Sequence, residues 1–303
     1  MYNYKLIKEI EKIYKNNGNI LENIKKINKA KYNTEEGIMI SYDFQSGTYV
    51  ENYKQNRAAV EVVWNDILNY LQRYCNGKYS ILECGVGEAT TFSYILKNLK
   101  IKPYKAFGFD ISWSRIKIGT EFLKENFLED KADLFVANMF DIPFKDESVD
   151  VVYTVHAMEP NGGNEEKLLK ELYRVAKRYL VLFEPIYELG SDKQKERMDN
   201  HGYVKNLKKI CKKLNYKIIE YGILENATNS LNRTGVIVIE KSIENANVCE
   251  FCDPVSKGEF VKGISSYYCS DSFLAYPIVE GIPCFNKSNA ILATKWKVLN
   301  ERK

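Results

Sequence analysis

The stretch that decides the fold of this chain is Ile81–Thr91, which reads ILECGVGEATT. It begins with a short apolar run typical of a strand, continues with Gly85 and Gly87, and passes into a helical pattern over Ala89–Leu99. Two closely spaced glycines permit a tight turn, so backbone N–H groups and a helix N-terminus can approach a ligand without a Cβ in the way. The stretch therefore predicts a strand–turn–helix unit that binds a ligand.

A second apolar strand ends in a carboxylate. Phe107–Ser112 reads FGFDIS, and Asp110 stands at the carboxyl end of its apolar run. An acidic residue about 20 residues after a glycine turn, as Asp110 is after Gly87, can accept hydrogen bonds from both hydroxyls of a ribose. The two segments together predict a nucleoside-containing cofactor at the carboxyl ends of parallel strands.

Two cofactors fit a glycine turn followed by a ribose-binding acid: a dinucleotide and S-adenosylmethionine. The dinucleotide fingerprint requires a third glycine where Thr90 stands, and Glu88 would place negative charge near a diphosphate. Glu83 and Glu88 would instead attract the positive charge of a sulfonium. The chemistry of the turn favours S-adenosylmethionine.

Four segments resemble, in order, those of class I S-adenosylmethionine-dependent methyltransferases of the type 11 kind. Glu83–Gly87 (ECGVG) resembles the first motif of that family, and Asp110 its ribose-binding acid. Asn138–Phe144 (NMFDIPF) is similar to the adenine-side segment, although Asn138 stands where the family usually has Asp. Lys145–Val155 resembles the strand beside the transferred methyl, and Leu168–Pro185 resembles the following helix and the fifth strand. The resemblance covers roughly residues 40–242.

The resemblance implies an α/β fold, a Rossmann-like seven-stranded mostly parallel sheet with helices on both faces. Alternating helical and strand patterns from residue 58 agree with it. Strands are expected near 80–84, 105–110, 133–137, 149–155, 178–184, 216–222 and 234–240. Helices are expected near 58–74, 89–99, 113–127, 164–177 and 203–214. Implied cofactor contacts are Glu83, Cys84, Gly85, Gly87, Asp110, Ile111, Asn138, Met139 and Thr154.

Composition is that of an ordinary soluble globular protein, with 45% hydrophobic and 28% charged residues in 303. The net charge of +4 does not by itself indicate nucleic acid. No apolar run approaches the roughly 18 residues of a membrane helix, and no signal-peptide block begins the chain. Seven scattered cysteines suit a reducing compartment, so we expect a cytoplasmic location without membrane association.

The N-terminal region, 1–57, is predicted to cap the domain that follows it, 58–242. Residues 4–31 carry apolar positions at helical spacing, which predicts one or two amphipathic helices, with a partner-binding or nucleic-acid-binding arm as the alternative. The tyrosine-rich segment Ser41–Tyr53 is broken by Gly47. Either it forms a lid over cofactor and substrate through Tyr42, Asp43 and Tyr49, or it packs on the surface.

Residues 243–303 differ in composition and predict a small α+β domain similar to a zinc ribbon. Cys249 and Cys252 form a C-x-x-C pair, and Cys269 follows at a distance. Because tetrahedral zinc takes four ligands, a structural zinc site needs a fourth, for which Asp271 and Cys284 are the nearby candidates and Asp271 is the one we expect. Residues 248–286, with their run Leu274–Pro283, also resemble the activator subunit of tRNA, rRNA and release-factor methyltransferases, except that Ser272 replaces the expected last ligand.

Candidate acceptor-side residues follow the later strands. His156 comes directly after the fourth strand, where a general base could take a proton from a hydroxyl acceptor, or the ring could be structural. Glu159 and Glu184 also follow strand ends, as bases or as partners of sugar hydroxyls. His201 lies in a loop that often lines the acceptor pocket of this fold.

Three functions remain open on the sequence. The first is methylation of a small molecule, most simply O-methylation of a polar metabolite or sugar; 154–160, TVHAMEP, lacks the motif of enzymes acting on base amines or glutamine amides. The second is methylation of tRNA or another translation component, suggested by the activator-like segment and a row of lysines over 205–213. The third is a non-catalytic nucleotide-binding protein. The fold alone does not decide between acceptors.

Overall fold

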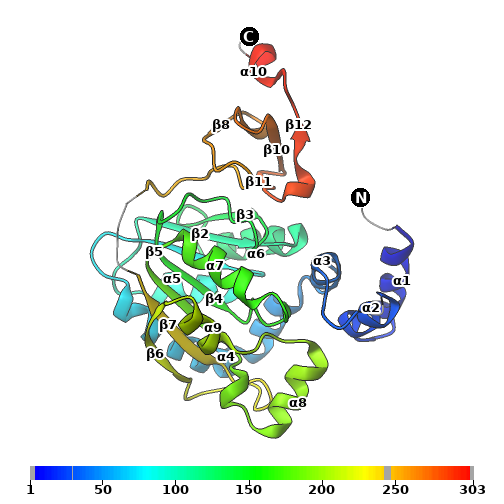
Figure 1. Cartoon of the computed structure of the whole chain (residues 1–303), viewed down its shortest axis with the longest axis vertical. Coiled ribbons are helices and arrows are strands. Elements are labelled where there is room, and N and C mark those ends of the chain that lie inside the picture. The colour runs from blue at the N-terminus through cyan, green and yellow to red at the C-terminus, as the bar shows by residue number, and fades with distance from the viewer. Residues whose placement is uncertain (1–3, 29, 242–246, 301–303) are drawn as a thin grey trace.

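A seven-stranded sheet forms the centre of the chain, and the computed structural model describes residues 4–28, 30–241 and 247–300 (Figure 1). The strand order is β3-β2-β1-β4-β5-β7-β6. The strands are β1 Ser80–Cys84, β2 Lys105–Asp110, β3 Asp133–Val136, β4 Val149–Val155, β5 Ala176–Glu184, β6 Lys217–Ile223 and β7 Gly235–Glu240. All seven lie at the positions that the sequence predicts.

The sheet is parallel except at β7. β1 pairs in parallel with β2 and β4, whereas β7 runs antiparallel to both β5 and β6. Every residue of β1 is buried, as expected for strands covered by helices on both faces. The predicted Rossmann-like, mostly parallel sheet is confirmed. Strand order reverses between β1 and β4, and ligands bind at such a reversal, at the carboxyl ends of the strands.

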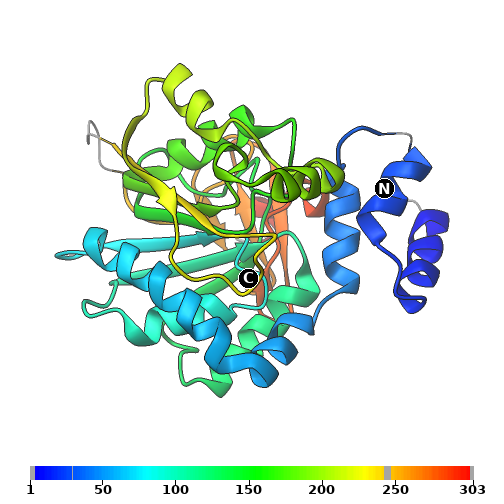
Figure 2. The same ribbon diagram turned by 90° about the horizontal axis from the view of Figure 1, so that it is seen from below.

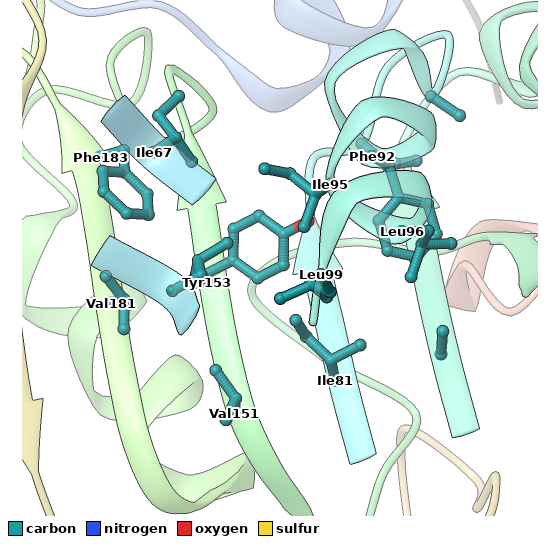
Figure 3. Packing of buried hydrophobic residues seen from close by; sticks show 14 of the residues in the cluster. Ile67, Ile81, Phe92, Ile95, Leu96, Leu99, Val151, Tyr153, Val181 and Phe183 are labelled. Carbon is teal, nitrogen blue, oxygen red and sulfur yellow. The ribbon is translucent and has the colours of Figure 1, made fainter. Parts of the chain in front are cut away.

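Helices cover both faces of the sheet and bury two apolar cores. On one face, α4, α5 and α6 contribute Ile67, Phe92 and Ile116; Figure 3 shows Ile67 and Phe92 among the side chains that surround Tyr153. On the other face, α7 and α9 contribute Leu168 and Leu207. The helices are α4 Thr48–Tyr74, α5 Thr90–Asn98, α6 Trp113–Glu125, α7 Glu165–Val175, α8 Asp192–His201 and α9 Leu207–Lys213.

Three short helices at the N-terminal end form a small unit beside the sheet (Figures 1 and 2). They are α1 Tyr4–Lys15, α2 Ile20–Asn28 and α3 Glu35–Phe44, and they share their own apolar cluster. The amphipathic helices expected in residues 4–31 are thus present. The tyrosine-rich segment is also helical, since α4 begins at Thr48 rather than near 58. Helix α4 departs from helical geometry at Asn56, beside the expected domain boundary 57/58.

The last region is a second, antiparallel sheet that lies against the edge of the first. Its strand order is β11-β10-β9-β8, with β12 paired to β10. The elements are β8 Phe260–Lys262, β9 Ser266–Cys269, β10 Leu274–Val279, β11 Ile282–Pro283, β12 Ile291–Leu292 and α10 Trp296–Asn300. Phe251, Tyr267 and Phe285 pack together with Phe135 of β3, so the two sheets share one core.

Of the predicted zinc ligands, Cys269 and Asp271 lie close together beside Gly258, but they do not form a metal site with Cys249 and Cys252. Cys249 lies against the main sheet, where its carbonyl accepts from Lys105 Nζ at 2.7 Å, whereas the Cys269 thiol is 3.5 Å from Ser256 Oγ. Within the residues described, no group of three or more His, Cys, Asp or Glu side chains could hold a metal ion. The loop that follows Cys252 is instead stabilised by Asp253, which accepts from Ser256 Oγ at 2.6 Å and from Tyr276 OH at 2.7 Å.

Two details of the helices differ from the prediction. The interval between β5 and the last helix was expected as a loop, but it contains α8, whose capping box joins Ser191 and Gln194. The helix expected over 203–214 is limited to α9, because Asn206 takes a left-handed conformation immediately before it. None of the helices in the described ranges is long and apolar enough to cross a bilayer.

Candidate active site

A cavity of about 360 Å³ lies at the carboxyl ends of β1, β2 and β4, beneath α3 and α4. It is lined by segments that are far apart in the sequence, including both ends of the turn after β1 and the loop between β6 and β7. A volume of this size lies within the range of small-molecule and cofactor sites. The cavity sits at the reversal of strand order, where the fold places ligands.

The turn after β1 requires its glycines. Gly85 and Gly87 have φ angles of 76° and 55°, in the left-handed region. A Cβ on Gly85 would lie 2.3 Å from the Cβ of Ala157, so a side chain there would force the loop after β4 away. Gly85 N donates to the Phe109 carbonyl at 2.8 Å, which joins the turn to β2.

Asp110 stands at the end of β2 with acceptor capacity to spare. Its two oxygens accept from the backbone N–H groups of Ser112, at 2.9 Å, and Gly87, at 3.1 Å. A carboxylate has about four lone-pair sites, so acceptor capacity remains for a ligand. Burial raises the pKa of Asp110, while nearby Arg115 and the backbone N–H groups oppose that shift. The side chain lines the cavity and suits a pair of ribose hydroxyls.

Alternation along β1 separates Glu83 from Cys84. Glu83 lines the cavity and accepts a hydrogen bond from Tyr153 OH, and burial raises the pKa of its carboxyl to about 8. Cys84 points to the opposite face, where it is fully buried in the core that includes Leu82. The predicted contact of Cys84 with the cofactor therefore does not involve its side chain.

The segment after β3, which the sequence predicts to face the adenine, forms another part of the cavity wall. Asn138 and Met139 line the cavity, as does Ile111 after β2, whereas Thr154 of β4 is fully buried and does not. The side-chain oxygen of Asn138 accepts from Phe140 N at 3.0 Å, so its amide N–H groups stay available to a ligand.

The second sheet supports this adenine-side segment from behind. Phe285 N donates to the Val136 carbonyl at 2.8 Å, and Cys252 N to the Pro143 carbonyl at 2.9 Å. Lys287 Nζ forms an ion pair with Asp141 at 2.7 Å. The C-terminal region thus holds both ends of the segment that carries Asn138.

In the loop after β4, which lies beside the glycine turn, His156 is held by partners on both ring nitrogens. Nδ1 is 2.9 Å from Glu159 Oε2, and Nε2 is 2.7 Å from Thr234 Oγ1. Asn232 Nδ2 also donates to Glu159 Oε2 at 3.3 Å. His156 has a φ of 51°, a conformation that residues with a Cβ adopt sparingly and that clusters at functional sites.

The charge state of His156 follows from this environment. Burial lowers the pKa of the imidazole, but the hydrogen bond and negative charge of Glu159, with the charge of Glu184, outweigh it and raise the pKa above its usual value. All four residues of the group, His156, Glu159, Asn232 and Thr234, line the cavity.

Glu184 and His201 do not line the cavity. Glu184 is 1% exposed, and its carboxylate accepts from the backbone N–H groups of Ala157, Met158 and Glu159 at 2.9–3.2 Å. It therefore positions the loop that carries Glu159. His201 ends α8, where its ring packs against Tyr203 with the centroids 5.4 Å apart.

Tyr42 and Tyr49 line the cavity at the junction of α3 and α4, and this junction is bound to the cofactor turn. Glu88 accepts from Gly47 N at 2.8 Å and from Val50 N at 2.7 Å, so it caps α4. Its charge is therefore used by the helix rather than facing a sulfonium. Asp43 accepts from Ser112 Oγ at 2.6 Å, next to Asp110.

The sequence did not single out Arg115, Asn232 or Thr234, which all line the cavity. Asn232 and Thr234 belong to 226–234, NATNSLNRT, a polar run between the last two strands that could have been recognised as a site loop. Arg115 lies in the first turn of α6, where a single arginine gives no signal.

Comparison with known proteins agrees with this geometry. Residues 82–182 match the family model of a methyltransferase domain. Magnesium protoporphyrin IX methyltransferase from Synechocystis PCC 6803, solved with bound S-adenosylhomocysteine, has the same fold, with a TM-score of 0.52 and 13% identity over 67% of this chain and 99% of that chain.

Two further structures are similar at lower scores. Geranyl diphosphate C-methyltransferase from Streptomyces coelicolor A3(2) has a TM-score of 0.47 and 11% identity over 59% of this chain and 77% of that chain. An S-adenosylmethionine-dependent methyltransferase from Aquifex aeolicus has a TM-score of 0.41 and 18% identity, over 57% and 87% respectively. The domain match confirms the predicted enzyme class and its cofactor, S-adenosylmethionine.

Proposed function

We propose that this S-adenosylmethionine-dependent methyltransferase methylates a hydroxyl group of a polar small molecule, such as a sugar or a polar metabolite. The observation that carries the proposal is the pair of His156 and Glu159 at the acceptor end of the cavity. A hydroxyl is a poor nucleophile until a base takes its proton, and a histidine oriented by a carboxylate is suited to that task.

Glu159 defines which nitrogen of His156 is basic. When Nδ1–H donates to the Glu159 carboxylate, Nε2 carries the lone pair and accepts the Thr234 hydroxyl. S-adenosylmethionine, when bound, supplies a methyl group carried on a sulfonium. Loss of that methyl group converts the sulfonium to a neutral thioether, which is the leaving group. The acceptor hydroxyl replaces the Thr234 hydroxyl at Nε2 of His156, and Nε2 takes its proton while the acceptor oxygen bonds to the methyl carbon. Glu159 stabilises the imidazolium that forms.

The surroundings of this pair favour a small, polar acceptor. Asn161, Asn229 and Asn232 supply amide groups to the same cavity, and α3 and α4 roof it. Such groups can bind several hydroxyls of one molecule. The alternative, an RNA acceptor, finds less support, because three of the lysines over 205–213 have partners within the chain.

Those partners are specific. Lys205 pairs with Asp199, Lys213 pairs with Glu166 at 2.7 Å, and Lys208 lies 3.8 Å from the ring centre of Tyr221. Phosphate contacts need lysines that are free to bind. The row of lysines therefore fits a solvated helix face better than a phosphate-binding stripe.

A labelling experiment tests the proposal. Methyl-labelled S-adenosylmethionine is incubated with fractionated cell extract and with wild-type protein, His156→Gln or His201→Gln. His201 is the only other histidine of the chain, which makes its variant a matched control. We expect label in small molecules or glycans with the wild type and His201→Gln, and a strong loss with His156→Gln. Label confined to RNA or protein would contradict the proposal.

A further inference from the structure

The charges that line the cavity are unbalanced. Glu35, Asp110 and Glu159 supply carboxylates, whereas burial raises the pKa of the Glu83 carboxyl to about 8 and leaves that group largely protonated near neutral pH. Among the lining residues that the structure describes, Arg115 is the only lysine or arginine. An acidic cavity suits the sulfonium and the ammonium of S-adenosylmethionine, but it would repel the carboxylate at the end of the cofactor's amino-acid tail.

The guanidinium of Arg115 is buried and incompletely bonded. The residue is 2% exposed, and its Nε donates to the Tyr42 carbonyl at 2.9 Å. Its Nη2, although buried, has no hydrogen-bond acceptor among the described residues. Buried guanidinium groups are usually satisfied by carboxylates, which match their fork of parallel N–H groups.

The position of Arg115 agrees with the tail of a cofactor that Asp110 holds by its ribose. A Cβ on Gly87 would be 3.5 Å from Nη1 of Arg115, so the guanidinium lies beside the glycine turn. The N–H of Gly87 in turn donates to Asp110. His156 and Thr234, which lie directly after β4 and directly before β7, line the same cavity.

We infer that Arg115 binds the carboxylate of the amino-acid tail of S-adenosylmethionine and makes the site selective for a cofactor with an intact tail. The inference rests on the cofactor of the proposed function and not on the identity of the acceptor. Nη2 then gains the acceptor that the protein does not supply, and the one cation of the cavity wall meets the one anion of the cofactor.

Arg115 also joins the tail to the lid. Its guanidinium lies between the rings of Tyr42 and Tyr49, 4.7 and 4.4 Å from their centres. Both tyrosines belong to the junction of α3 and α4 that roofs the cavity. A carboxylate on Arg115 therefore fixes the guanidinium against the lid, and a cofactor without this group would leave the lid less ordered.

Decarboxylated S-adenosylmethionine is the probe that tests this inference, because it keeps the sulfonium, the ammonium and the nucleoside. Each ligand is titrated calorimetrically into the wild type, Arg115→Met, Arg115→Lys and Arg73→Met. Arg73 is the matched control, since it also lies on tyrosine rings, with its guanidinium 4.3 Å from the ring centre of Tyr70, but does not line the cavity.

We expect the wild type and Arg73→Met to bind S-adenosylmethionine roughly 10- to 100-fold more tightly than the decarboxylated form, the range of a charge-assisted pair of hydrogen bonds. Arg115→Met should lose this preference, and Arg115→Lys should retain part of it. Equal binding of both ligands by the wild type would overturn the inference and leave the proposed function unaffected. This comparison uses the wild type alone, so it does not depend on whether a variant folds. Failure of both ligands to bind would overturn both.

Discussion

Two groups of residues line the cavity and are built in different ways: the turns that we propose hold the cofactor, called the cofactor end, and the His156 group that we propose meets the acceptor, called the acceptor end. The cofactor end consists of turns that follow neighbouring strands, where Gly85 N donates to the Phe109 carbonyl and Gly87 N donates to the Asp110 carboxylate. The acceptor end consists of side chains, and His156 meets Thr234 across 78 residues of sequence. Shape is fixed by the backbone at one end, and chemistry by side chains at the other. Substitutions at the two ends should therefore affect different measured quantities.

The largest effect is expected at Gly85. A Cβ in Gly85→Ala would lie 2.3 Å from the Cβ of Ala157, at a φ of 76°. The clash and the left-handed conformation together should lower the free energy of unfolding by roughly 2–5 kcal/mol and abolish cofactor binding. Urea denaturation and titration with S-adenosylhomocysteine measure the two effects.

Gly222→Ala is the matched control for this substitution, because nothing lies within 4 Å of a Cβ at that position. We expect it to change stability by less than about 1 kcal/mol and to leave cofactor affinity intact. If Gly85→Ala behaved in the same way, the turn would not be the rigid cofactor support described here.

The next effect concerns turnover. His156→Gln should lower kcat by roughly 10²- to 10⁴-fold, the usual contribution of a general base, with cofactor affinity nearly unchanged. In the wild type, kcat should increase as the pH rises through the raised pKa of His156, because only the neutral imidazole accepts a proton. The pH profile of methyl transfer checks this. Parallel losses of kcat and cofactor affinity would make His156 a structural residue.

A third prediction concerns the support that the second sheet gives the cofactor end. Phe285→Ala removes a ring that packs on Phe135 of β3, and should cost about 3–5 kcal/mol of stability while weakening cofactor binding more than turnover. Phe273→Ala is the control, since Phe273 is 47% exposed and should change little. An unchanged affinity in a folded Phe285→Ala protein would separate the second sheet from the site.

The last prediction is a pH dependence of stability at Glu83. Its pKa is about 8 in the folded chain and near 4.5 when exposed. Between these values the folded state binds more protons than the unfolded state, so this group lowers stability as the pH rises, by at most about 1.4 kcal/mol per pH unit. Glu83→Gln should therefore become more stable relative to the wild type from pH 5 to pH 8. A constant difference in Tm across that interval would contradict it.

Much of the cofactor end could be predicted from the sequence because its determinants are local. Apolar runs bounded by Gly85 and Asp110 locate the strand ends, and parallel strands bring those ends together. The part played by Glu88 could not be predicted, because the helix that it caps begins at Thr48, far away in the chain. Asn232 and Thr234 meet His156 only through the pairing of β5 with β7.

In the C-terminal region, the sequence pattern predicted a site that the structure does not contain. Its cysteine spacing predicted a metal site, but Cys249 and Cys269 are buried in different places, and an aromatic cluster with Asp253 holds the sheet together. Cysteine spacing indicates ligands only when the intervening chain folds back to form the site. The local pattern of residues 249–271 did not indicate that aromatic packing, rather than a metal ion, stabilises this sheet.

The most direct test of the account is an equilibrium titration of S-adenosylhomocysteine into the wild type, Asp110→Ala and His156→Gln. Loss of the ribose-binding carboxylate should weaken binding by about 1.5–3 kcal/mol, the scale of a hydrogen bond to a charged group. We predict that His156→Gln binds as the wild type does. If the Asp110 variant bound normally, or both variants weakened equally, the two ends of the cavity would not be the separate cofactor and acceptor sites described here.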